Sequence, residues 1–150
     1  MITYVDTSMV IKLLVEEPGS DHAARIWDEA DDLVAARLLY VEARSALAAA
    51  KRAGRLSAAQ HRRTKADLED LWAQLAIVEI TAELVTDAAD LSEHDRLRGY
   101  DAVHLAAALL AGAHVFATAD QDLATAAGRH GLHVANPDDL PAEAGAGPGS

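Results

Sequence analysis

The stretch that most constrains the fold lies at the N-terminus, where a short β-forming run leads directly into an aspartate. Residues 2–5 are Ile, Thr, Tyr and Val, which favour a strand, and Asp6, Thr7 and Ser8 follow at once. The next apolar residues return at helical spacing. The sequence therefore predicts a strand, a turn at Asp6 and then a helix, which is the unit from which α/β sheets are built.

Asp6 has two interpretations. An aspartate after a strand ordinarily caps the next helix, because its side chain accepts hydrogen bonds from the first helical amides. In an open parallel sheet, however, ligands bind at the carboxyl ends of the strands, where a carboxylate can also serve chemistry. The choice depends on whether other carboxylates occupy similar positions.

Length and composition indicate one cytoplasmic domain. The chain has 150 residues, enough for a single core, and it contains no cysteine, which excludes thiolate metal sites and a cysteine nucleophile. No targeting segment opens the sequence, and no apolar run reaches membrane-spanning length.

The charge of the chain is unevenly distributed. A formal net charge of -11 argues against general nucleic-acid binding, because phosphates repel an acidic surface. Residues 51–65 nevertheless contain no acid and several cations. They form either a solvated helix–turn–helix face or a patch that contacts phosphates. The candidate phosphate contacts are Lys51, Arg52, Arg55, Arg62 and Arg63.

Beyond the first strand, short apolar runs alternate with helical patterns. Strands are expected near residues 33–36, 76–80, 115–118 and 132–134, and helices near 9–15, 20–27, 38–53, 57–75, 81–91, 101–110 and 122–129. This alternation predicts a parallel sheet with right-handed crossovers and helices on both faces. We expect Gly99 to interrupt the helical pattern, and the helix after it to be buried on all sides.

One domain should cover residues 1–137. Residues 138–150, rich in Pro, Gly and Ala, are expected to form a flexible tail.

Glu42 lies on a helix face whose other members are small or apolar. Glutamate is seldom buried without a partner. Either Glu42 pairs with an arginine such as Arg37 or Arg44, or it meets a cation.

Three aspartates add to this pattern. Asp101 opens the most apolar helix, Asp120 follows a strand as Asp6 does, and Asp122 lies two residues further on. Each could be a helix cap or a favourable first-turn acid. A bound metal ion would explain all of these acids together, because carboxylates packed closely repel one another unless a cation neutralises them. An all-oxygen site favours Mg²⁺ or Mn²⁺ over Zn²⁺, and leaves Thr7 and Ser8 to cap the first helix.

These residues resemble the PIN-domain family, and within it the VapC-type ribonuclease toxins of type II (VapBC) toxin–antitoxin systems. The resemblance covers residues 2–137 and rests on four motifs in order. They are Tyr-Val-Asp-Thr-Ser at 4–8, Val-Glu at 41–42, Tyr-Asp-Ala-Val-His-Leu-Ala at 100–106 and Thr-Ala-Asp-Gln-Asp-Leu at 118–123.

The resemblance implies a three-layer α/β/α fold with a five-stranded parallel sheet in the order 3-2-1-4-5. It also implies a metal-dependent endoribonuclease that hydrolyses RNA phosphodiesters with a metal-activated water, leaving a 5′-phosphate. A homodimer is implied, as is a VapB-type antitoxin that covers the active-site groove. By the same resemblance, the catalytic and metal-binding set is Asp6, Glu42, Asp101 and Asp120, with Asp122 as an accessory ligand and Thr7, Ser8 and Thr118 in supporting hydrogen bonds.

Other classes fit less well. A phospho-acceptor receiver domain needs paired acids after the first strand, and an Asp-x-Asp phosphatase needs a second aspartate where Ser8 stands. A non-catalytic PIN-like module that binds RNA or protein is the remaining alternative. His104 is interpreted as a packed or partner-contacting residue, not as a metal ligand.

Overall fold

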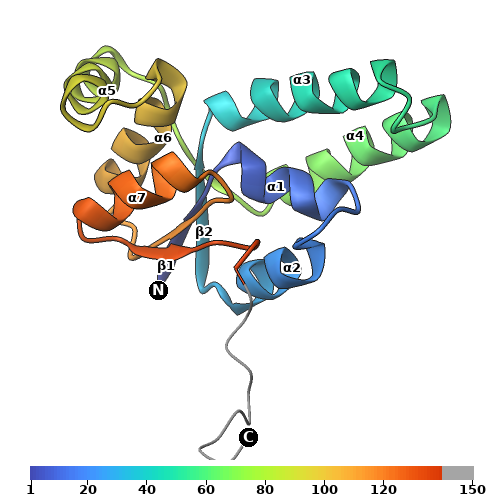
Figure 1. Cartoon of the computed structure of the whole chain (residues 1–150), viewed down its shortest axis with the longest axis horizontal. Coiled ribbons are helices and arrows are strands. Elements are labelled where there is room, and N and C mark those ends of the chain that lie inside the picture. The colour runs from blue at the N-terminus through green and yellow to red at the C-terminus, as the bar shows by residue number, and fades with distance from the viewer. Residues whose placement is uncertain (140–150) are drawn as a thin grey trace, which may run out of the picture.

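Five parallel strands form one sheet in the order β3-β2-β1-β4-β5 in the computed structural model, which describes residues 1–139 (Figure 1). The strands are β1 (Ile2–Val5), β2 (Asp32–Ala36), β3 (Ala76–Val78), β4 (Val115–Ala117) and β5 (His133–Ala135). The predicted sheet and strand order are confirmed. The first strand is central because β2 pairs with one of its edges and β4 with the other.

Seven helices in the described part of the chain connect and cover these strands. They are α1 (Thr7–Leu14), α2 (Ser20–Glu29), α3 (Leu38–Arg52), α4 (Ala58–Trp72), α5 (Ala82–Asp95), α6 (Gly99–Leu110) and α7 (Gln121–Arg129). No helix among residues 1–139 is both long and apolar enough to cross a membrane.

Two cores, one on each face of the sheet, produce the three layers. Successive strand residues point to opposite faces, so Tyr4 packs in one core and Val5 in the other. The core around Tyr4 and Phe116 contains residues of α5, α6 and α7. The core around Val5 contains residues of α1 to α4. The predicted α/β/α arrangement is therefore confirmed.

Two expectations for the α5–α6 region are wrong. Gly99 does not interrupt the helical pattern but is the first residue of α6, because a helix start leaves its amides unpaired and tolerates glycine. The α6 helix is also not buried on all sides, since Leu110 in its last turn is 65% exposed.

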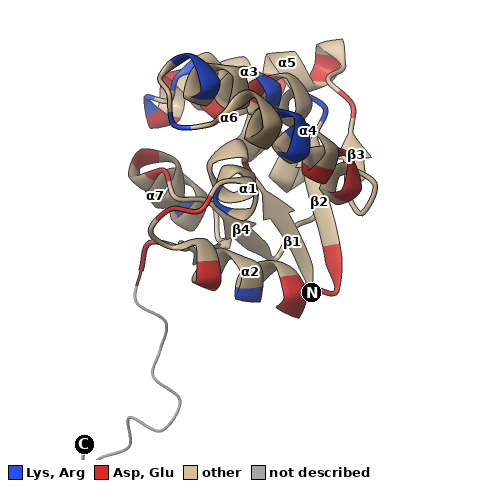
Figure 2. Cartoon of the chain, turned by 90° about the vertical axis from the view of Figure 1, so that its right-hand side faces the viewer, with Lys and Arg blue, Asp and Glu red and all other residues tan. Residues whose placement is uncertain are grey.

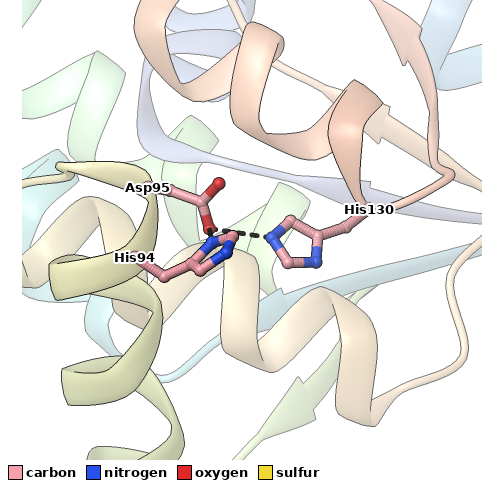
Figure 3. Close-up of side chains that lie close together, drawn as sticks. All are labelled: His94, Asp95 and His130. Atoms are coloured by element: carbon pink, nitrogen blue, oxygen red, sulfur yellow. Dashed lines mark hydrogen bonds and ion pairs between the residues drawn. The ribbon is translucent and has the colours of Figure 1, made fainter.

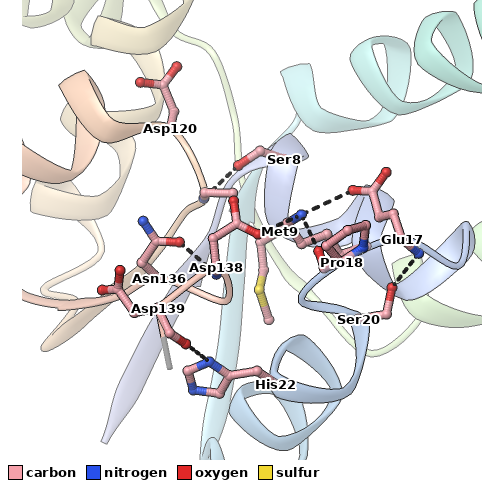
Figure 4. A network of polar contacts seen from close by, with 12 residues as sticks. Ser8, Met9, Glu17, Pro18, Ser20, His22, Asp120, Asn136, Asp138 and Asp139 are labelled. Atoms are coloured by element: carbon pink, nitrogen blue, oxygen red, sulfur yellow. Dashed lines mark hydrogen bonds and ion pairs between the residues drawn. The ribbon is translucent and has the colours of Figure 1, made fainter. Parts of the chain in front are cut away.

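The segment after β5 is tied to the turn between α1 and α2 (Figure 4). Lys12 Nζ lies 3.3 Å from Glu17 Oε1, 2.9 Å from Asp138 Oδ1 and 2.7 Å from the carbonyl oxygen of Pro18. Opposite charges and a carbonyl thus surround the buried ammonium group. Asp138 belongs to the stretch assigned from the sequence to the tail, and the rest of that stretch, from residue 140, lies outside the described residues.

Candidate active site

Four acidic side chains meet at the carboxyl edge of the sheet. Asp6 directly follows β1, and Asp120 lies just beyond β4, which pairs with β1 through Val5 and Ala117. Glu42 projects from the second turn of α3, and Asp101 from the first turn of α6. Strand ends and helix starts therefore carry the predicted residues to one place.

Asp6 is buried and held by three donors. Its Oδ1 accepts hydrogen bonds from Ser8 Oγ (2.7 Å) and the Met9 amide (3.1 Å), and its Oδ2 accepts one from Thr118 Oγ1 (2.5 Å). Burial raises the pKa of this carboxyl, although the three hydrogen bonds and the nearby His104 oppose the rise. The expectation that Thr7 and Ser8 cap α1 is wrong: Asp6 is itself the N-cap, because the Met9 amide points at its carboxylate.

Hydroxyl groups connect Asp6 to Asp120. The Thr118 hydroxyl donates to Asp6 and accepts the amide of Asp120 (2.9 Å). The Ser8 hydroxyl accepts the amide of Ala119 at 2.9 Å (Figure 4). Asp120 Oδ1 in turn caps α7 through the Leu123 amide at 3.1 Å. The loop after β4 is thus fixed against the start of α1.

Glu42 pairs with a histidine and a threonine, not with an arginine. Its Oε1 lies 2.7 Å from Thr7 Oγ1 and 2.6 Å from His104 Nε2. The proposed arginine partners are engaged elsewhere, since Arg37 binds Glu79 and Arg44 binds the hydroxyl of Tyr40. Partial burial raises the pKa of Glu42, but the hydrogen bond and charge of His104 outweigh it and hold that pKa below its usual range.

His104 is the last member of a buried relay that begins at the backbone of β2. The Ala36 amide donates to the Tyr4 hydroxyl oxygen (3.2 Å), and this hydroxyl lies 2.7 Å from His104 Nδ1. Burial raises the pKa of Tyr4, so its hydroxyl keeps its proton. The other ring nitrogen of His104, Nε2, contacts Glu42, so the imidazole connects the Tyr4 hydroxyl to the carboxylate. Sequence reasoning assigned His104 to packing and did not identify this link.

The guanidinium of Arg98 lies near both Asp101 and Asp120. Arg98 Nε lies 3.6 Å from Asp101 Oδ2, and an Arg98 NH2 nitrogen lies 4.0 Å from Asp120 Oδ2. Burial raises the pKa of Asp101, and the charge of Asp120 raises it further. Arg98 also was not identified from the sequence, although its position three residues before Asp101 on a helix start is the available signal.

The four acids form a suitable all-oxygen donor set for a hard divalent cation. Among residues 1–139, no three of their carboxylates have oxygens mutually within 4.8 Å. The repulsion between Asp101 and Asp120 is only partly neutralised by Arg98, a side chain that is 69% exposed. The site therefore has an excess of negative charge that a divalent cation would neutralise.

Comparisons with known proteins identify the family. The model of the PIN domain matches residues 3–129. The chain belongs to the PIN-domain family. Its sequence is 42% identical over 136 residues to ribonuclease VapC45 and ribonuclease VapC49 of two Mycobacterium tuberculosis strains, covering 89% of this chain and 94% of each relative. The resemblance to VapC-type proteins predicted from the four motifs is confirmed.

Solved structures support the same PIN fold. FitAcB from Neisseria gonorrhoeae superposes with a TM-score of 0.72 at 19% identity, covering 93% of this chain and 100% of that one. The M. tuberculosis VapC20, a sarcin–ricin loop cleaving toxin, has a TM-score of 0.65 at 21% identity, covering 83% and 94%. At these identities the likeness concerns the fold alone.

Two groups of predicted site residues make no hydrogen bond or ion pair with the four acids of this PIN domain within residues 1–139. Asp122 is exposed in the first turn of α7, and its carboxylate makes no hydrogen bond or ion pair within the described residues. The basic stretch lies on the exposed end of the α3–α4 hairpin, which faces the viewer in Figure 2. In this stretch the pKa of His61 is lowered, first by desolvation and then by the charges of Lys65 and Lys51.

Proposed function

We propose that this PIN domain is a metal-dependent endoribonuclease and the toxin of a toxin–antitoxin pair. The observation that carries the proposal is the cluster of Asp6, Glu42, Asp101 and Asp120. Hydrogen bonds from other elements hold Asp6 and Glu42, and the pKa values of Asp6 and Asp101 are raised. Relatives that are 42% identical are ribonucleases, which supports RNA as the substrate.

In this proposal the four acids hold Mg²⁺ or Mn²⁺, and Asp122 is an accessory ligand. Bound ions of this kind would supply Lewis-acid chemistry, making water a better nucleophile and neutralising the charge that develops on the phosphodiester. Asp6 and Asp120 are kept in place by Thr118 and Ser8. Glu42 is kept in place by Thr7 and His104, so its carboxylate stays ionised and faces the site.

The cations of this chain would position the RNA. Arg98 is exposed beside Asp101 and Asp120 and offers a guanidinium to a phosphate next to the scissile bond. Further out, α3 runs from Glu42 near one end to Lys51 and Arg52 at the other, a rise of about 15 Å over ten residues. An RNA strand that lies along α3 would reach both the acids and the basic end.

The proposal includes an antitoxin and a second copy of the chain. A groove between α3 and α4 is lined by apolar residues, among them Leu38, Val41, Trp72 and Ile80, and also by Arg37, Tyr40 and Glu69. Val41, which precedes Glu42 in the chain, is 60% exposed there. In this proposal an antitoxin segment binds in this groove and extends from it over the acids. Solved toxin–antitoxin complexes with the same fold support such a partner. We expect the homodimer to act in the cytoplasm, where RNA is available.

The test is cleavage of cellular RNA by purified, antitoxin-free protein with Mg²⁺ or Mn²⁺ and with excess chelator. Asp101→Asn should abolish cleavage, by at least about 100-fold, because it removes a charged ligand while preserving shape. The matched control is Asp28→Asn, which neutralises an exposed acid on α2 and should leave cleavage unchanged. Cleavage that persists in chelator or in Asp101→Asn would overturn the metal assignment.

Binding of RNA without cleavage under all these conditions would favour the non-catalytic module instead. Mapping the 5′ ends of cellular RNA after brief expression would then show no new ends. With an active toxin, the same experiment identifies the target.

A further inference from the structure

A second cluster of metal-ligating side chains lies away from the four acids, where α5 and α7 end (Figure 3). Asp95 is the last residue of α5, and His94 directly precedes it. His130 is the C-cap of α7. Ligand atoms of these three residues all lie within 4.8 Å of one another, the one such group among residues 1–139.

Asp95 occupies an unfavourable position for a carboxylate. Its side chain is 1% exposed, and it lies in the last turn of α5, where the helix dipole disfavours negative charge. The C-terminal end of α7 lies beside it, so the partial negative charges of two helix ends converge there. The backbone turns sharply just after Asp95, because Arg96 has a φ of 57°. Such a site attracts a cation.

Arg129 neutralises the charge of Asp95 only weakly. An Arg129 NH1 nitrogen is 3.9 Å from Asp95 Oδ1, and the side chain of Arg129 is 63% exposed. The stronger contacts of Asp95 are to the two imidazoles, at 2.8 Å from His130 Nε2 and 3.4 Å from His94 Nδ1, both measured to Oδ2. Oδ2 thus lies between two imidazole nitrogens, a kind of atom that commonly binds metal ions.

The donor set and spacing suit a tetrahedral transition metal. With bond lengths near 2.1 Å, two ligands of tetrahedral Zn²⁺ lie about 3.4 Å apart. The His94–Asp95 distance already has this value, and the shorter His130–Asp95 hydrogen bond would open by about half an ångström. Two imidazoles and one carboxylate select Zn²⁺ over Mg²⁺, in contrast to the all-oxygen set of the four acids. His94 is 80% exposed, which leaves the fourth position open to water.

We propose that His94, Asp95 and His130 form a Zn²⁺ site that fastens the end of α5 to the end of α7. The segment from Arg96 to Arg98 leaves this cluster and leads into α6, which carries Asp101. The bound ion stabilises the fold and fixes the loop that presents Arg98 to the active site. Binding of Zn²⁺ here does not depend on the proposed ribonuclease activity.

The test is titration of chelator-treated full-length protein with Zn²⁺, in excess Mg²⁺ so that the four acids are occupied. Calorimetry should show one tight equivalent, and the melting temperature should rise with Zn²⁺ concentration because the ion binds the folded state. Co²⁺ serves as a spectroscopic probe, and it should show the visible absorption of a tetrahedral centre with nitrogen and oxygen ligands.

His94→Ala is the decisive variant, because an exposed side chain is removed and the fold should be preserved. Its Zn²⁺ affinity should fall by about tenfold or more, and His130→Ala should show the same loss. His133→Ala, an exposed histidine on β5, is the matched control and should bind as the unaltered protein does. The proposal is overturned if the unaltered protein binds no Zn²⁺, or if His94→Ala binds it equally well.

Discussion

At the scale of single residues, the site depends on a buried hydrogen-bond relay as much as on the acids. The amide of Ala36, the hydroxyl of Tyr4 and the imidazole of His104 form one line that ends on Glu42. Each member has its partner, so loss of one leaves others buried and unsatisfied. Glu42 therefore has a fixed position before any substrate or ion arrives.

Tyr4→Phe tests this relay. The change leaves the Ala36 amide and His104 Nδ1 without their buried partner, and should lower the free energy of unfolding by about 1–3 kcal/mol, measured by urea denaturation. Cleavage should fall as well, because the ring of His104 is no longer fixed. Tyr40→Phe is the control, since it removes an exposed hydroxyl that binds Glu69 and should cost less than about 0.5 kcal/mol. Equal costs in the two variants would contradict the relay.

Asp101 should reduce stability at neutral pH in the absence of metal. Burial and the charge of Asp120 raise its pKa in the folded state. Between the unfolded and the folded pKa, the folded protein binds more protons, so the free energy of unfolding falls as pH rises through that window and stays lower above it.

Asp101→Asn removes this penalty. In chelator at neutral pH, its melting temperature should exceed that of the unaltered protein by about 2–4 °C for a gain on the order of 1 kcal/mol. The difference should vanish in acid, below the unfolded pKa, where both states are protonated. A variant that is less stable than the unaltered protein at neutral pH would show that the Arg98 ion pair outweighs the repulsion.

The sequence predicted the four acids but not what orients them. An acid after a strand or on an apolar helix face is visible in the local pattern, and Asp6, Glu42, Asp101 and Asp120 all had that signal. The partners of Glu42 come from positions far along the chain, at Thr7 and His104, and only the sheet and α6 bring them together. Local patterns carry no information on such contacts, which is why an arginine was expected instead.

At the scale of elements, turn chemistry determines how the helices meet. The parallel sheet was predicted from the alternation of strand and helix, and its strand order from the family resemblance, whereas the end of α5 and the start of α6 were misplaced. A helix start at Gly99 is supported by the packing of α6 against α5 and β2, which outweighs the low helix propensity of glycine. The tie between the α1–α2 turn and the segment after β5 was likewise not visible in the local sequence.

Gly19 is required for that tie. Its φ is +93°, and a Cβ there would come within 2.8 Å of the Pro137 carbonyl oxygen and of Asp138 Oδ1. Gly19→Ala should therefore cost about 1–2 kcal/mol for the left-handed backbone, plus about 1–3 kcal/mol for the clash. The control is Gly54→Ala, where φ is +79° but no atom lies within 4 Å of the added carbon. Urea denaturation should show the larger loss for Gly19→Ala, and equal losses would mean that the contact with residues 137 and 138 is unimportant.

At the scale of the whole molecule, charge is segregated. The net charge of -11 repels RNA at long range, while the acids of the site repel it at the scissile bond unless cations neutralise them. The exposed cations at the end of the α3–α4 hairpin form a positively charged surface that attracts RNA phosphates (Figure 2). Binding should therefore be strengthened by neutralisation of the acids and should require direct phosphate contacts at the hairpin.

Neutralising the hairpin tests the second requirement. In an Asp101→Asn background, where RNA is bound but not cleaved, Arg62→Ala with Arg63→Ala should weaken binding and flatten the dependence of log K on log salt. The slope should fall by about 0.7–0.9 for each phosphate contact removed, because each contact releases condensed counterions. Arg25→Ala, an exposed arginine on α2, should leave the slope unchanged. If the double variant keeps the slope of its parent, the hairpin is a solvated surface and the RNA follows another path to the acids.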